Sequence, residues 1–329
     1  MELRILTADD VRRALPMVEA IAAVKQAFAQ LSQGQAEVPL RSRLAVESRQ
    51  SVVLFMPAYL KQTEDLAVKI VSVFPHNSTQ GFPTIHALVV VVDPTTGRPA
   101  ALLEGAALTA IRTGAASGAA TDLLARPDAT VAAIFGSGAQ ARTQLEAVCT
   151  VRTIRQVQVY GIDADSVRQF VSDMAGHGPI PHDVRPASTP AEAVEEADIV
   201  CTATTSSTPV FDGRLLRPGT HVNAIGSYTP AMQEVDAETL RRSLVVVDSR
   251  SAVLAESGDL MIPIQRGEFS PEGIHAELGE IVAGIRPGRT STDQITFFKS
   301  VGNAVQDAAA ARMALERAAR SGLGRVVEI

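Results

Sequence analysis

The chain has 329 residues, of which 46% are hydrophobic, and its formal net charge is −6 at pH 7. This length suits about two domains with sizeable apolar cores, and the acidic balance argues against a nucleic-acid partner, which needs a basic face. The apolar run at 87–92, ALVVVV, is far shorter than the ~20 residues of a membrane span, so no membrane partner is expected.

The first residues and the two cysteines predict the compartment. The segment MELRILTADD has no basic end followed by an apolar stretch, so we expect no secretory signal. Cys149 falls in a predicted helix and Cys201 in a predicted strand, and their spacing fits no metal site. Two buried thiols suit a reducing compartment. We therefore expect a cytoplasmic protein without a bound metal.

The first third of the chain does not have the pattern of a nucleotide-binding domain. Residues 16–34 have apolar positions at helical spacing, with Pro16 near the start and Gly34 at the end. Four strands are predicted next, at 51–59, 66–74, 85–93 and 100–105. Strands in succession without helices between them indicate an antiparallel sheet. Residues 108–125, rich in Ala and Gly, predict a long helix suited to close packing.

From residue 131 the pattern changes to strands that alternate with helical or looped segments. Apolar strands are predicted at 131–135, 156–161, 197–206, 220–227 and 243–249. Strands that are apolar throughout and alternate with helices indicate a parallel sheet covered on both faces. Residues 295–322 predict one more long helical stretch. The fold class is therefore α/β, with a doubly wound parallel sheet bracketed by a first domain that the C-terminal helix rejoins.

The stretch VAAIFGSGAQAR (131–142) predicts a loop that binds a dinucleotide phosphate. Gly136 permits a tight turn, Gly138 lets the backbone approach a pyrophosphate, and Ala141 fills the third small position of the pattern. The helix that follows presents unpaired N–H groups to the anion. The alternative, a structural turn only, is disfavoured because a buried strand precedes the loop and a second strand follows.

The end of the second strand, VYGIDAD, leaves the choice of cofactor open. Gly161 stands where an acid for the ribose of NAD is usual, and no Arg or Lys for the NADP phosphate follows at once. Asp163 either accepts a ribose hydroxyl or caps the next helix. We expect NAD or NADP, with a preference for NAD.

Three cations in the first domain are candidates for binding a carboxylate. Lys69 lies in an apolar strand, where an ammonium is costly unless an anion pairs with it. The alternatives are an edge-strand lysine for Lys69 and an interdomain ion pair for Arg112. Arg41 is less certain, because Arg43 is close by. Arginine binds carboxylates through two parallel hydrogen bonds, which favours a carboxylate clamp.

These segments resemble the ornithine cyclodeaminase/mu-crystallin family over nearly the whole chain. The motifs that carry the resemblance are VPLRSRL, MPAYL, VKIVSVFP, DPTTGRPAALLEG with LTAIRTGAAS, FGSGAQAR and FFKSVGNAVQD. The resemblance implies a substrate-binding and dimerisation domain of residues 1–118 and 302–329. It also implies an inserted Rossmann-type domain of residues 119–301, a homodimer formed through the first domain's sheet, and a small amino or imino acid as the substrate.

The family's functional residues carry over position by position. Arg41, Lys69 and Arg112 match residues that bind the substrate carboxylate. Matches to cofactor contacts are Thr84 near the substrate, Ala139 and Gln140 in the phosphate loop with Gly136, Ser137 and Gly138, and Thr202, Ala203 and Thr204 on the adenosine side. Ser300 and Val301 match residues that close over the nicotinamide and the substrate.

Two departures from the cyclodeaminases point to simple reduction. Their catalytic Asp follows NAVGG, whereas the loop here reads NAIGSYTPAMQEVD, with Tyr228 at that position. Their Glu before MP is also absent, because Leu54 and Phe55 precede Met56. We therefore predict NAD(P)H-dependent reduction of a cyclic imino acid such as Δ1-pyrroline-2-carboxylate.

Several alternatives stay open. Tyr228 either supplies a hydroxyl to the site, with the three cations, or packs. The other candidate activities are an alanine dehydrogenase-like or N-alkyl amino acid dehydrogenase and, disfavoured by the two missing acids, an ornithine cyclodeaminase. A non-enzymatic binding protein like the lens crystallin is the remaining alternative, although such a protein needs no carboxylate clamp.

Overall fold

The computed structural model describes residues 1–329 apart from the side chain of Ser78, and the chain divides into two compact units. Unit 1 comprises Met1–Arg112 and Asn303–Ile329, and unit 2 comprises Thr113–Gly302. The sequence placed the first boundary after residue 118. The helix α3 (Gly105–Leu124) continues through this region without a break, so no local signal marks where one unit ends.

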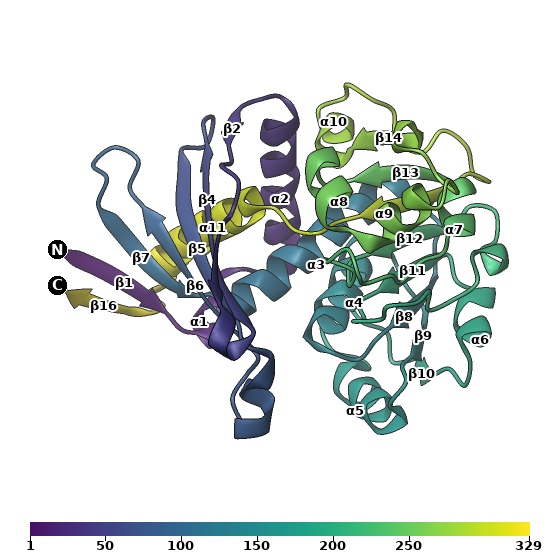
Figure 1. Ribbon diagram of the computed structural model, residues 1–329. Helices are drawn as coiled ribbons and strands as arrows, with labels where there is room; N and C mark the ends of the chain where they lie inside the picture. The colour runs from purple at the N-terminus through teal and green to yellow at the C-terminus, as the bar shows by residue number, and fades with distance from the viewer. The chain divides into compact units, whose positions relative to one another are not determined.

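Unit 1 is a mixed sheet covered on one face by helices (Figure 1). Its strands are β1 (Glu2–Leu6), β2 (Ala36–Glu37), β3 (Ser42–Val46), β4 (Ser51–Leu60), β5 (Asp65–Val73), β6 (Ile85–Val92), β7 (Pro99–Glu104) and β16 (Arg325–Glu328). Its helices are α1 (Ala8–Ala14), α2 (Met17–Ser32), α11 (Ala304–Ser321) and the start of α3. The strand order is β16-β1-β7-β6-β5-β4-β2, with β3 on β4. The four predicted strands, β4 to β7, pair antiparallel as expected.

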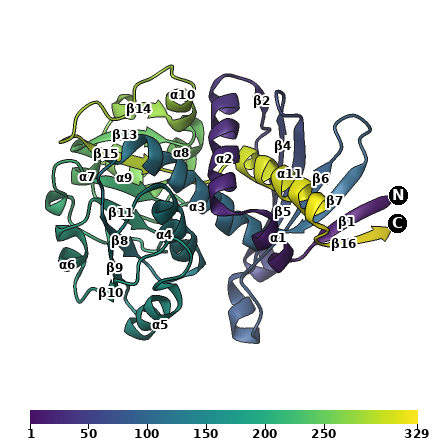
Figure 2. The ribbon, with the colours of Figure 1, turned by 180° about the vertical axis from the view of Figure 1, so that it is seen from behind.

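The helix α11 packs against β4, β5 and α2, as both ribbon views show (Figures 1 and 2). Along β5, Ala67 and Lys69 are buried while Ile70 is exposed, because successive side chains of a strand point to opposite faces. The residues that end unit 1 in the sequence also join its sheet: β16 pairs antiparallel with β1, and the Met1 ammonium donates to the Ile329 carbonyl at 2.7 Å.

Unit 2 is a parallel sheet with helices on both faces. Its strands are β8 (Val131–Phe135), β9 (Gln156–Tyr160), β10 (Val184–Pro186), β11 (Ile199–Thr202), β12 (His221–Ala224), β13 (Ser243–Val247), β14 (Ile274–Glu277) and β15 (Ile295–Lys299). Its helices after α3 are α4 (Ala139–Val151), α5 (Ala164–Met174), α6 (Pro190–Glu195), α7 (Ala237–Arg241), α8 (Arg250–Glu256), α9 (Gly258–Gln265) and α10 (Leu278–Val282).

The strand order of unit 2 is β10-β9-β8-β11-β12-β15-β13-β14, and all of the pairs are parallel. Alternate residues of β8 serve two cores. Ala132 and Ile134 pack with α4 and α5, whereas Ala133 and Phe135 pack with α6 and the helices after it. The predicted doubly wound sheet is confirmed. The chain reverses direction across the sheet between β8 and β11, the switch point at which such folds bind ligands.

The single helix predicted for 295–322 is wrong in its first part. Residues 295–299 form β15, which lies between β12 and β13 in the sheet. All five of its residues are buried. The segment ITFFK contains β-branched and aromatic residues, which fit a buried strand. Gly302 then adopts a φ of +86°, which ends the extended segment, and Asn303 caps α11.

None of the helices in the described part of the chain combines the length and apolar character needed to cross a bilayer.

Candidate active site

Two of the three predicted carboxylate-binding cations meet on one acid in unit 1. The Lys69 ammonium lies 2.6 Å from one oxygen of Asp307, and Arg112 Nε lies 3.0 Å from the other. All three side chains are buried, with exposed fractions of 4% for Lys69, 6% for Arg112 and 2% for Asp307. Two cations on one carboxylate leave a net positive charge in a buried cluster, which an anionic ligand would neutralise.

The position of Lys69 excludes its alternative explanation. The strand β5 pairs with β4 on one side and β6 on the other, so Lys69 is not an edge-strand lysine. The ion pair of Arg112 is made with α11 of its own unit, so the suggested interdomain pair is also wrong. Arg41 is partly buried, and its charge helps to lower the pKa of Lys69, so the structure brings the three cations into one electrostatic cluster.

The residues that the sequence analysis missed are Asp307 and Gln306, on the first turns of α11. The Gln306 side-chain oxygen accepts hydrogen bonds from the Arg112 guanidinium and from the backbone N–H of Asn303, which completes a capping box. A signal was present in the sequence, because Asp307 is the one acid in the run AVQDAAAA. An acid so placed on a helix packed against a sheet is buried, and a buried acid requires a cation.

Burial gives Lys69 an unusual protonation equilibrium. Loss of hydration lowers the pKa of Lys69 to about 8, against the opposing effect of Asp307, and the charges of Arg112 and Arg41 add to the lowering. Lys69 is therefore the group of this cluster that gains and loses a proton near neutral pH.

In unit 2 the glycine loop has the features of a phosphate-binding turn. Gly136 has a φ of +105°, and a Cβ there would lie 2.7 Å from the Ala203 carbonyl oxygen. Gly138 is exposed, and a Cβ there would meet no described heavy atom within 4 Å. No described side chain caps α4 at Gly138, so the first N–H groups of this helix are available to an anion. These residues fit a dinucleotide pyrophosphate.

Asp163 has the capping role that the sequence left as one of two alternatives. Its carboxylate accepts hydrogen bonds from the backbone N–H of Asp165 and the hydroxyl of Ser166, at the start of α5. The Ser166 hydrogen bond is the main cause of a lowered pKa for Asp163. Contact with a ribose stays a prediction.

The remaining predicted residues of unit 2 lie on one edge of its sheet. Thr202 ends β11, Ala203 and Thr204 follow it, Tyr228 lies in the loop after β12, and Ser300 and Val301 follow β15. The carboxyl ends of parallel strands share one edge, so these segments lie on the same edge as the Gly136 loop. The buried Asp248 holds the last segment, because its carboxylate accepts from the Ser300 hydroxyl at 2.7 Å and the Val301 N–H at 3.0 Å.

Tyr228 and Thr84 are both exposed. The Tyr228 side chain is 47% exposed, so it does not act as a core packing residue in unit 2. Thr84 belongs to unit 1, immediately before β6, and its carbonyl accepts from the N–H of Phe74.

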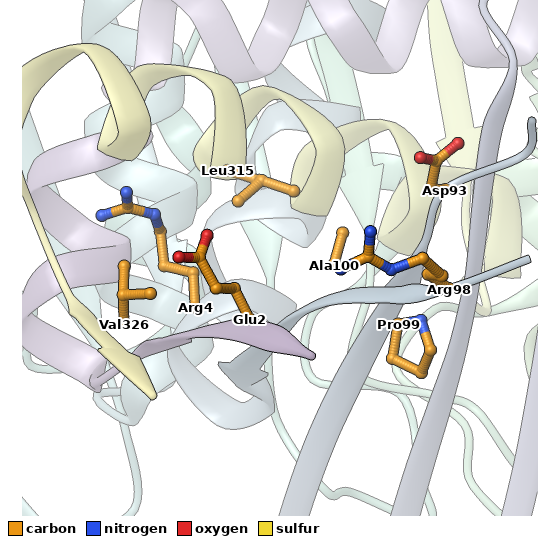
Figure 3. A pocket seen from close by; sticks show the side chains of 8 residues that line it. All are labelled: Glu2, Arg4, Asp93, Arg98, Pro99, Ala100, Leu315 and Val326. Carbon is orange, nitrogen blue, oxygen red and sulfur yellow. The ribbon is translucent and has the colours of Figure 1, made fainter. Parts of the chain in front are cut away.

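One hollow in unit 1, of about 280 Å³, lies away from the predicted site residues. Figure 3 shows its charged side chains, Glu2 with Arg4 and Asp93 with Arg98. Hydrogen bonds from the Thr95 N–H and from Thr96, with a smaller effect of the Arg98 charge, lower the pKa of Asp93. The Arg4 guanidinium donates to the backbone carbonyl of Leu323. The two cations are matched by two acids, so this hollow does not present the net charge of the Lys69 cluster.

The chain is similar to known reductases and dehydrogenases along its whole length. The Δ1-pyrroline-2-carboxylate reductase of Bacillus cereus is 40% identical, covering 98% of this chain and 99% of the relative. The structure of the Thermococcus litoralis Δ1-pyrroline-2-carboxylate reductase in complex with NADH and L-proline has a TM-score of 0.92 and 45% identity, covering 98% and 99% of the two chains. An archaeal alanine dehydrogenase dimer with bound NAD has a TM-score of 0.91 and 34% identity, covering both chains completely.

The resemblance seen in the sequence motifs is confirmed by the family's own pattern, which matches residues 1–322. The chain belongs to the ornithine cyclodeaminase/mu-crystallin family.

Proposed function

We propose that this protein is an NAD(P)H-dependent reductase that converts a small cyclic imino acid, such as Δ1-pyrroline-2-carboxylate, to the L-amino acid. The observation that carries the proposal is the buried cluster of Lys69, Arg112 and Asp307, whose net positive charge suits a substrate carboxylate. The relatives named Δ1-pyrroline-2-carboxylate reductase support the same substrate class.

In this mechanism the residues of the chain bind and orient the substrate. Arg112 and Lys69, with Arg41, hold the carboxylate and so fix the position of the C=N carbon. Orientation of this kind supplies up to about 7–11 kcal/mol of barrier reduction. Gly136 to Gln140, with Thr84, Thr202 to Thr204, Asp163 and Ser300, would hold the dinucleotide. The reduced nicotinamide, when bound, would supply the hydride for the imine carbon, and the imine nitrogen would gain a proton.

Two groups are candidates for handling that proton or its hydrogen bond. Lys69 has a pKa of about 8, so it exchanges protons near neutral pH. Tyr228, exposed at the carboxyl edge of the unit 2 sheet, offers a phenolic hydroxyl. Val301, next to Ser300, is the proposed apolar contact of the substrate ring.

The direct test is turnover by the purified protein. We expect loss of the reduced-nicotinamide absorbance with Δ1-pyrroline-2-carboxylate and NADH, and a comparison with NADPH determines the cofactor preference. Parallel reactions with pyruvate plus ammonia and pyruvate plus methylamine test the alanine dehydrogenase and N-alkyl amino acid alternatives, the first of which the archaeal relative favours. Absence of turnover of the cyclic imine with either cofactor would refute the proposal.

Substrate affinity is expected to fall as the pH rises through about 8. Above this value Lys69 loses its proton and the cluster loses the charge that attracts a carboxylate. L-Proline bound to the enzyme–NADH complex is a suitable probe, because the charges of proline itself do not change between pH 7 and 9. We expect the Kd of L-proline for this complex to rise about tenfold from pH 7 to pH 9. Calorimetric titration measures this Kd.

The matched control is Lys69→Arg, because a guanidinium keeps its proton throughout this pH range. Its Kd profile is expected to be flat, whatever its absolute value. A flat profile for the unmodified protein would contradict the role of Lys69.

The lowered pKa of Lys69 affects the stability of the fold in the opposite direction. Between pH 8 and 10.5 the unfolded chain binds more protons than the folded chain. The cost of burying Lys69 is therefore fully present at pH 7, and it declines as the pH rises from about 8 to 10.5, so the free energy of unfolding increases.

We also propose that the protein is a cytoplasmic homodimer. On the face of the unit 1 sheet away from α11, Phe55, Ile70 and Leu88 are exposed, and strand register places them side by side on β4, β5 and β6. Such an apolar row favours burial by a second copy, and the archaeal relative is described as a dimer. The molar mass in solution tests the assembly. The two buried, unpaired cysteines suit a reducing cytoplasm.

A further inference from the structure

Glu234 is a buried carboxylate that accepts hydrogen bonds from two separate loops of unit 2. It has no measurable exposure. One oxygen accepts from the backbone N–H and the hydroxyl of Thr204, at 2.6 and 2.8 Å. The other accepts from the Thr202 hydroxyl at 2.9 Å and from the N–H groups of Gly226 and Ser227, at 2.6 and 3.1 Å. Five donors directed at one carboxylate favour its charged form.

The burial of Glu234 is costly, and a neighbouring ion pair, between Lys299 and Asp259, holds the segment that carries it. Burial, together with the charge of Asp259, raises the pKa of Glu234. Asp259 accepts hydrogen bonds from the backbone N–H groups of Glu234 and Val235, at 2.6 and 3.1 Å. The fully buried Lys299 donates to the other oxygen of Asp259 at 2.7 Å. The segment that carries Glu234 is therefore fixed at the same edge of the sheet as the loops that it binds.

Glu234 joins a loop at the switch point of the sheet to the loop that follows the neighbouring strand β12. One follows β11 and contains the proposed cofactor contacts Thr202 to Thr204. It also lies against the phosphate turn, because a Cβ on Gly136 would lie 2.7 Å from the Ala203 carbonyl oxygen. The other follows β12, where a Cβ on Gly226 would clash with the Thr204 carbonyl oxygen. The backbones of the two loops are therefore packed closely together, and the Glu234 carboxylate accepts hydrogen bonds from both of them.

We infer that Glu234 is a positioning residue of the dinucleotide site: its carboxylate holds the loops after β11 and β12 in the geometry that receives the cofactor. This inference rests on the proposed function. Glu234 itself need not touch the cofactor. Its contribution is to fix the Thr202–Thr204 backbone beside the glycine turn before the cofactor binds, which removes an ordering cost from binding.

The test is Glu234→Gln. Hydroxyl donors can rotate away, but backbone N–H groups cannot. Thr204 donates its N–H to one oxygen and Gly226 donates its N–H to the other, so either orientation of the amide places an NH2 group against a backbone N–H. We expect the Kd for NADH to rise about 10- to 100-fold. The chain has no tryptophan, so the fluorescence of NADH itself reports binding.

The matched control is Asp198→Asn, at the amino edge of the same sheet. Asp198 is also buried and accepts hydrogen bonds from the N–H groups of Thr130 and Val131 as well as from Arg126. Both variants are expected to lower Tm. Only Glu234→Gln is expected to weaken NADH binding, with the KM of the imino acid at saturating NADH changed less than about threefold.

The outcomes separate the inference from the proposed function. An unmodified protein that binds neither NADH nor NADPH would overturn the proposed function. An unmodified protein that binds NADH, with Glu234→Gln binding it equally well, or with Asp198→Asn losing as much affinity, would overturn only the role of Glu234. Should Glu234→Gln not fold, Glu234→Asp, which keeps the charge but shortens the reach, takes its place. We expect a smaller rise in Kd for Glu234→Asp, and a Kd equal to that of the unmodified protein would overturn the role of Glu234.

Discussion

Replacing Arg112 with alanine is expected to raise the KM for the imino acid by about 100- to 1000-fold, with kcat much less affected. The described contacts of Arg112, to Asp307 and Gln306, use two of its five N–H donors, which leaves three for a substrate carboxylate. Loss of a buried charge-assisted pair costs about 3–4 kcal/mol, which corresponds to this change in affinity. Steady-state kinetics at saturating cofactor and pH 7 measure it.

Arg112→Lys is the control for charge without geometry. A lysine keeps the positive charge but cannot form two parallel hydrogen bonds. The KM of this variant is therefore expected to lie between that of the unmodified protein and that of Arg112→Ala. Replacement by alanine leaves Asp307 paired with Lys69 alone, which can lower the stability of the fold. Thermal unfolding therefore checks that each variant is folded. A folded alanine variant whose KM is unchanged would remove Arg112 from the site and leave it a structural partner of α11.

Gly138→Ala is expected to weaken NADH binding by about 100-fold while Tm falls only slightly. Gly138 has a φ of −80°, which alanine adopts readily, and its Cβ would enter space that no described atom fills. Alanine at this N-cap position costs about 1 kcal/mol or less of stability. The space at Gly138 is where the pyrophosphate must approach the backbone, so the added methyl group acts on the ligand and not on the fold.

Gly136→Ala is the companion variant, with the opposite balance of effects. Its φ of +105° and the 2.7 Å approach to the Ala203 oxygen strain any residue with a Cβ. Such strain costs about 1–3 kcal/mol, so Tm falls clearly. NADH fluorescence titration with thermal unfolding separates the two variants. Normal NADH affinity in Gly138→Ala would show that the turn is structural only.

Much of the fold could be predicted because its signals are local. The strands β4 to β7 follow each other with no α-helix between them, and β8 leads directly into the glycine turn and α4. The error at 295–322 arose because helical spacing in 304–321 was extended back over a segment whose buried strand character depends on its neighbours β12 and β13. The pattern of a short apolar run does not distinguish a buried strand from a buried helix segment.

The site was predictable only in part, because its charges are matched over long distances in the sequence. Lys69 and Arg112 are recognisable as cations in apolar elements, but Asp307, their shared partner, is 238 and 195 residues away. Glu234 was equally hidden. Three of its five donors are backbone N–H groups, and the residue type at a position does not indicate where its backbone N–H donates. Pairing of this kind becomes visible only when the topology brings the elements together.

The division of unit 1 between the two ends of the sequence has a consequence for how the molecule is made. Residues 113–302 form one uninterrupted unit, which can begin to fold as soon as it leaves the ribosome. Lys69 and Arg112 are made early, but the carboxylate that neutralises them arrives with α11, after all of unit 2. A nascent chain cannot bury two unmatched cations. The amino-terminal sheet is therefore completed only after α11 and β16, which follow unit 2 in the sequence, have been translated.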